Sequence, residues 1–71
     1  MEVKSVFTES EVFQLRALIA ELSRTSDQSQ KKKIRAKMRR KIGFYISDWG
    51  INDFQPEDFE DLIRTGRIRI I

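Results

Sequence analysis

The segment 31–41 (KKKIRAKMRRK) leaves this chain few ways to fold, because eight of its eleven residues are lysine or arginine. Its apolar residues Ile34 and Met38, with Ile42 just beyond, recur at four-residue steps, which is helical spacing. A helix built in this way can bury only one narrow stripe and must leave its other faces to solvent or to a partner. The sequence therefore predicts a strongly basic helix over residues 28–42.

Two further helices are predicted from their start signals. Thr8 and Glu11 stand three residues apart, as in a capping box, and an apolar periodicity follows, so a helix is expected over residues 9–23. Pro56 suits the first turn of a helix and is followed by two acids, so another helix is expected over residues 56–65.

Short strands are predicted between and after these helices. Residues 44–47 are aromatic and β-branched, and residues 67–71 alternate arginine with isoleucine, a period typical of a half-buried strand. Residues 3–7 are a further candidate strand. If strands 44–47 and 67–71 pair directly, the crossover through the helix 56–65 makes them parallel, and the other two helices would cover one face. The strand order is left open by the sequence. The chain, residues 1–71, is thus predicted to be a single small α+β domain.

Composition excludes several kinds of site. The chain has no cysteine and no histidine, so disulfides and thiolate zinc sites are excluded and few groups remain for acid–base or nucleophilic chemistry. We expect no catalytic residue, no cofactor, no metal and no small-molecule substrate. No apolar run reaches the roughly 20 residues of a membrane span, and the N-terminus does not look like a signal peptide, so a cytoplasmic protein is expected.

The basic segment has two interpretations. Removing it changes the formal balance from +3 to six bases against eleven acids, so it carries the basic character of the chain. It could neutralise nucleic-acid phosphates, with little sequence preference because it lacks Asn, Gln, Ser and Thr. It could instead be a solvated face, or be covered by the acidic segment 48–61. The candidate contacts to phosphate or to an acidic partner are Lys32, Lys33, Arg35, Arg39 and Arg40.

Aromatic residues follow the basic segment closely, since five of the seven lie between residues 44 and 59. Most are expected to pack in the core of so small a domain. Tyr45 and Trp49 each carry a polar atom, and they are the candidates for base stacking or for an interface.

The last strand suggests a route to self-association. Ile68, Ile70 and Ile71 would make an unpaired strand edge apolar, so they are the candidate dimer edge. Arg67 and Arg69 argue against it, because charges on an edge strand often prevent pairing.

The second half resembles small uncharacterised bacterial proteins over residues 42–71. The resemblance rests on Gly43-Phe44-Tyr45, Ser47-Asp48, Asp58-Phe59, Leu62-Ile63, Gly66 and the alternating last strand. It implies a compact bacterial domain and brings no known activity. The favoured hypothesis is a non-catalytic domain that acts through protein–protein contacts and forms a homodimer. The alternative is a nucleic-acid-binding accessory protein that uses the basic helix 31–41 on phosphates.

Overall fold

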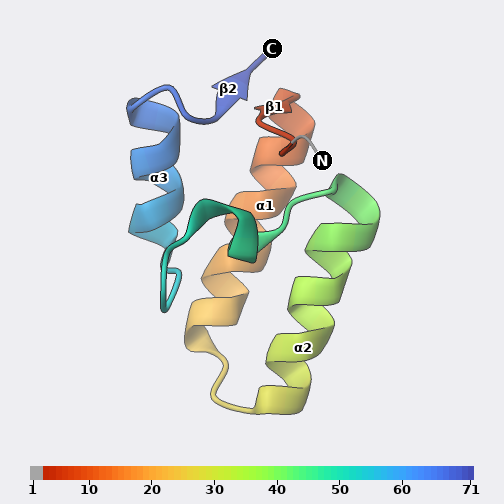
Figure 1. Ribbon diagram of the computed structural model, residues 1–71. Coiled ribbons are helices and arrows are strands. Elements are labelled where there is room, and N and C mark those ends of the chain that lie inside the picture. The colour runs from red at the N-terminus through yellow and green to blue at the C-terminus, as the bar shows by residue number, and fades with distance from the viewer. Residues whose placement is uncertain (1–2) are drawn as a thin grey trace.

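The computed structural model describes residues 3–71 and forms an α+β domain of three helices and a small two-stranded parallel sheet (Figure 1). The elements follow in the order β1, α1, α2, a π turn η1, a short 3-10 helix η2, α3 and β2. Helices α1 and α2 lie side by side, α3 packs on α1, and η2 lies in front of the helices (Figure 1).

Helix α1 spans Glu9–Arg24 and confirms the predicted helix to within one residue. The backbone N–H of Glu11 donates to Thr8 Oγ1 at 3.1 Å, and the N–H of Thr8 donates to Glu11 Oε1 at 2.9 Å. This capping box satisfies two N–H groups that would otherwise lack partners. The buried face of the helix consists of Val12, Leu15, Ile19 and Leu22.

The predicted basic helix is confirmed as α2, Gln28–Lys37, continued by the π turn η1, Met38–Ile42. All three apolar stripe residues are buried: Ile34, Met38 and Ile42. In a regular α-helix, residues spaced four apart are rotated relative to one another by about 40° around the helix axis. The wider π turn reduces this rotation, so that Ile42 at the end of the stripe still faces the core. Gly43 ends the turn at φ 81°, in the left-handed conformation.

The predicted strand 44–47 is wrong. Ile46–Trp49 forms the 3-10 helix η2, and the N–H of Asp48 donates to the carbonyl of Tyr45 at 3.1 Å. Ser47 and Asp48 favour turns over ladders, and the fully buried ring of Phe44 fixes the segment against the core by its side chain. The N–H groups of Phe44 and Asp48 donate within turns, to the carbonyls of Met38 and Tyr45, and not to a neighbouring strand.

Helix α3 spans Pro56–Arg64 and confirms the third predicted helix, with its end one residue early. The N–H of Gln55 donates to Asp58 Oδ2 at 2.8 Å, which fixes the first turn. Phe59 and Leu62 form its buried face against α1.

The sheet pairs β1, Val6–Phe7, with β2, Arg69–Ile70, in parallel. Val6 stands opposite Arg69, and the N–H of Arg69 donates to the carbonyl of Ser5 at 2.8 Å. The parallel pair considered for 44–47 and 67–71 does not form, and the last strand pairs in parallel with part of the 3–7 candidate instead. Both strands are shorter than expected.

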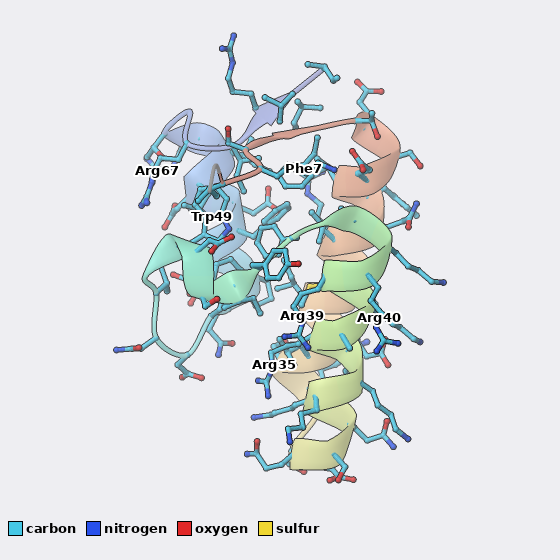
Figure 2. The ribbon with its side chains drawn as sticks, turned by 45° about the vertical axis from the view of Figure 1, so that its right-hand side comes forward. Phe7, Arg35, Arg39, Arg40, Trp49 and Arg67 are labelled. Carbon is cyan, nitrogen blue, oxygen red and sulfur yellow. The ribbon has the colours of Figure 1, made fainter. Side chains whose placement is uncertain are left out.

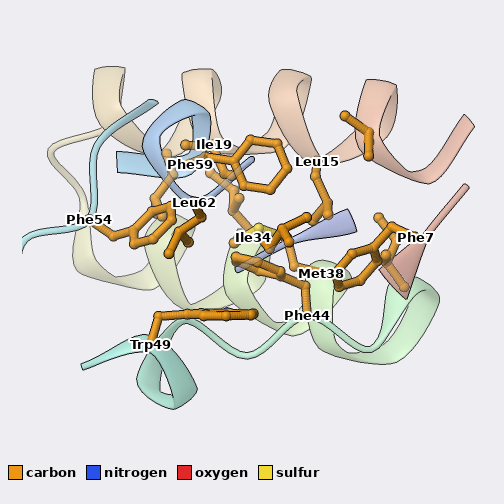
Figure 3. Close-up of a cluster of buried hydrophobic side chains, with 14 residues drawn as sticks. Phe7, Leu15, Ile19, Ile34, Met38, Phe44, Trp49, Phe54, Phe59 and Leu62 are labelled. Carbon is orange, nitrogen blue, oxygen red and sulfur yellow. The ribbon is translucent and has the colours of Figure 1, made fainter. Parts of the chain in front are cut away.

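The core is one cluster centred on Phe44 (Figure 3). The Phe44 ring lies 6.0 Å from Phe7 and 6.1 Å from Trp49 between centroids, and the rings of Phe54 and Phe59 meet it edge-on at 5.9 and 5.7 Å. Such aromatic pairs contribute about 0.5–1.5 kcal/mol each beyond their buried area. The cluster compensates for the few apolar residues of α2.

Candidate functional site

The candidate basic residues point in two directions from α2 and η1. Arg35 and Arg39 extend toward the side of η2, whereas Arg40 extends away from it (Figure 2). Arg35 is half-buried, and Arg39 and Arg40 are exposed, as are Lys32 and Lys33. The five candidates therefore do not form a single cluster.

None of the eight bases of segment 31–41 has an acidic partner within residues 3–71. The ion pairs of this part of the chain are Lys4 with Glu11 at 3.0 Å, Arg16 with Glu60 at 2.9 Å, and Arg64 with Asp61 at 2.7 Å. Helix α3 packs against α1, and its Glu60 is paired there. Within one copy, the acidic segment 48–61 forms no ion pair with the basic helix.

A groove runs between α2 and the segment 45–55. It consists of two adjoining hollows of about 260 and 300 Å³, which share Arg35 and Ile46. Lys31 lines the first hollow and Arg39 lines the second, so three cations at four-residue steps form one wall. The opposite wall carries polar side chains from the 45–55 segment, namely Tyr45, Ser47, Asp53 and Gln55.

The two candidate aromatic residues differ sharply in exposure. Tyr45 is 46% exposed and lines the second hollow. Trp49 is 7% exposed, and its ring stacks on Phe44 inside the core (Figure 3). The Arg67 guanidinium lies 5.7 Å above the Trp49 ring, and the buried Nε1–H of Trp49 has no hydrogen-bond partner within residues 3–71. Of these two candidates, only Tyr45 is exposed enough to stack with a ligand.

Part of this groove was not predicted from the sequence. Lys31 was not among the candidate residues, although it stands four residues before Arg35, the same step that marks the apolar stripe. Ser47, Asp53 and Gln55 could not be assigned to it, because only the tertiary fold brings their segment beside α2. They supply the hydroxyl, carboxylate and amide groups that segment 31–41 lacks.

The candidate dimer edge is only partly accessible. Ile68 is 1% exposed and belongs to the core, so it cannot contact another chain. Ile70 and Ile71 are 40% and 77% exposed. The prediction that residues 67–71 alternate between core and solvent therefore fails at Ile70, because the paired part of the strand is only two residues long.

A third hollow, of apolar character, lies between α1 and the end of the basic helix. Phe13, with a 76% exposed side chain, lines it together with Ala17 and Leu18 of α1 and with Lys37 and Lys41. The sequence signal was visible, because Phe13 stands off the buried face of α1. No segment within residues 3–71 covers it.

Within the described residues, no three acidic, histidine or cysteine side chains gather as metal ligands would, and no helix has the length and hydropathy to cross a bilayer. Comparison of the chain with protein-family models, with curated proteins and with solved structures gives no match. The functional argument therefore rests on the geometry of the groove and of the basic helix.

Proposed function

We propose that this protein binds nucleic acid through the phosphate backbone, as a non-catalytic accessory protein, with the cations of the basic helix as its contacts. The observation that carries the proposal is that none of the eight bases of segment 31–41 forms an ion pair within residues 3–71, whereas Lys4, Arg16 and Arg64, which lie outside this segment, each pair with an acid. Unpaired, exposed cations on one helix can neutralise phosphates without first breaking internal ion pairs.

The placement of these charges in the helix supports the same function. A lysine in the first turn of a helix opposes its dipole, at about 0.3–1 kcal/mol at low salt, and the effect falls off beyond that turn. Lys31 lies at the end of the first turn of α2, and Lys32, Lys33 and Arg35 follow close behind it. A polyanion bound along this helix would offset both the dipole term and the mutual repulsion of the cations.

The test is a titration of labelled DNA and RNA at several salt concentrations. The logarithm of the binding constant should fall linearly with that of salt, with a slope of about −0.9 per phosphate contacted on a duplex and about −0.7 on a single strand. No binding at low salt would refute the proposal.

A triple variant separates the basic helix from net charge. Changing Arg35, Arg39 and Arg40 to Gln should abolish binding and leave the circular dichroism spectrum unchanged. The matched control changes Arg24, Arg64 and Arg69 to Gln, which removes the same formal charge from outside the basic helix. Equal loss of binding in both triple variants would mean that net charge alone attracts the nucleic acid, and the assignment to α2 would fail.

Self-association through the open sheet edge is a second candidate function, with protein contacts as its basis. Val3, Val6, Ile70 and Ile71 are 40–77% exposed, and they lie along the two short strands or beside them. Light scattering should then give a dimer mass, and Ile70→Asp should return it to that of a monomer. A monomer mass at millimolar concentration for the unaltered chain would contradict this candidate.

A further inference from the structure

The groove beside α2 has two chemically different walls. Lys31, Arg35 and Arg39 form a cationic wall, and the facing wall is made by side chains of segment 45–55. A surface that only neutralised phosphates would need no second wall. The second wall carries one exposed aromatic ring and three groups able to hydrogen-bond, which are the parts that recognise bases.

The cationic wall suits an extended backbone. Four residues of helix rise about 6 Å, so Lys31 and Arg39 are separated by about 12 Å along the axis. The backbone of an unpaired strand is flexible, so the strand can adjust the spacing of its phosphates to that of the cations.

The polar wall fixes which way such a strand would face. The carboxylate of Asp53 would repel a phosphate, and it is held in the groove wall by the Gln55 amide, whose Nε2 donates to Asp53 Oδ1 at 3.3 Å. A carboxylate accepts hydrogen bonds from the exocyclic amines of bases instead. Phosphates are therefore favoured at the α2 wall, and base edges at the Asp53 wall.

The ring of Tyr45 adds a contact that only unpaired bases can use. It is 46% exposed and lines the same hollow as Arg39. Bases in a duplex are stacked on one another, whereas bases in a single strand are free to stack on an aromatic side chain. The hollows are open and lie at or below the roughly 300 Å³ lower limit of small-molecule pockets, which suits a strand lying across them.

We propose that this groove binds single-stranded nucleic acid, with phosphates on Lys31, Arg35 and Arg39, one base stacked on Tyr45, and base edges toward Ser47, Asp53 and Gln55. The inference rests on the proposed function and adds the class of ligand and its orientation. Ribose and deoxyribose strands share this chemistry, and the experiment includes both.

The test measures fluorescence anisotropy with single-stranded DNA and RNA of about twelve nucleotides, within the range of single-strand site sizes, and with the duplex of the same sequence. Both single strands, or one of them, should bind at least tenfold more tightly than the duplex at the same salt concentration. Binding of neither single strand nor duplex would remove the proposed function as well as this inference. Equal binding of single strand and duplex would remove only the inference.

Substitutions at Tyr45 test the stacking contact. Tyr45→Ala should weaken single-strand binding by roughly 5- to 100-fold, which is the usual effect of losing one stacked base. Tyr45→Phe keeps the ring and should bind within twofold of the unaltered chain. Neither change touches the core, because the side chain is half exposed. An alanine variant that binds as tightly as the unaltered chain would overturn the inference.

A pair of neighbouring arginines tests the groove itself. Arg39 lines the groove and Arg40 points away from it (Figure 2), so Arg39→Gln and Arg40→Gln remove the same charge from different sides. Arg39→Gln should make the salt slope shallower by about 0.7, the value for one single-strand phosphate contact, and Arg40→Gln should change it little. Equal effects of the two substitutions would place the strand outside the groove and overturn the inference, while leaving phosphate binding by the helix intact.

Discussion

Arg16 of α1 and Glu60 of α3 form an ion pair with two hydrogen bonds: Nε donates to Oε2 and Nη2 donates to Oε1, both at 2.9 Å. The pair joins side chains 44 positions apart in the chain and fixes α3 against α1.

Glu60→Gln should lower the free energy of unfolding by about 0.2–1 kcal/mol, because both side chains are half exposed and solvent screens the pair. Urea denaturation at low and high salt measures this, and the effect should shrink at high salt. Asp61→Asn is the matched control, because it breaks the more exposed pair with Arg64 within one helix. A loss above 2 kcal/mol at Glu60 would show that the contact is more than a screened surface pair.

The stability of the α1 start should depend on pH through Glu11. The backbone N–H of Thr8, and then the Lys4 ammonium, hold the pKa of the Glu11 carboxyl below its ordinary value. The unfolded chain therefore binds this proton more readily than the folded chain. The stabilisation is present above the ordinary carboxyl pKa of about 4.3 and is lost as the pH falls through the lower folded value.

The Glu11→Gln variant should accordingly have a lower free energy of unfolding than the unaltered chain at pH 7, and the difference should shrink at pH 3. Urea titrations at both pH values would measure this. Thr8→Ala removes the other half of the capping box and should lower the free energy of unfolding by about 1 kcal/mol, whereas Thr8→Ser retains the capping hydroxyl. A stability difference for Glu11→Gln that does not change with pH would contradict the role of the charge.

Truncation of Phe44 and of Phe13 to alanine should change the free energy of unfolding by very different amounts. Phe44 is 1% exposed at the centre of the aromatic cluster, so Phe44→Ala should cost about 3–5 kcal/mol. Chains of this length are stable by only about 4–11 kcal/mol, so this loss is a large fraction of the total and should lower the melting temperature strongly. Phe13→Ala, at a 76% exposed side chain, should change stability by less than about 0.5 kcal/mol. Thermal melts of both variants would decide this, and similar melting temperatures would contradict the observed core.

Gly43 should not tolerate a side chain. Its φ of 81° is left-handed, which costs alanine about 1–2 kcal/mol. In a domain of this size, 1 kcal/mol lowers the melting temperature by about 4–8 °C. Gly50→Ala is the control, because its φ of 65° lies within the left-handed region of about +50 to +70° that other residues can adopt, and it should lose less. Greater loss at Gly50 than at Gly43 would contradict this dependence on φ.

The helices could be predicted because their signals are local. The capping residues of α1, the proline of α3 and the four-residue stripe of α2 lie within the elements that they specify. Strand pairing is not local. An apolar run such as 44–46 fits a strand or an irregular core segment equally well, and only the packing of the Phe44 side chain decides between them.

The same distinction applies to the candidate site. The basic helix was evident as a run of charges, but which cations share a groove depends on the segment 45–55, which the fold places beside α2. The burial of Trp49 likewise follows from stacking on Phe44 and from the arginine above it, contacts that join separate parts of the chain. The positive charge of the basic helix was therefore predictable from the sequence, whereas the facing wall of the groove was not.

The π turn of η1 makes the direction in which the chain leaves the basic helix depend on a single residue. The N–H of Gly43 donates to the carbonyl of Met38, five residues back, at 3.0 Å, so this turn holds one residue more than an α-helical turn. A shortened chain that lacked one residue between Arg39 and Lys41 could close the turn as α-helix, with every later side chain rotated by about 100°. Phe44 would then point away from the core, and the groove wall that begins at Tyr45 would face elsewhere.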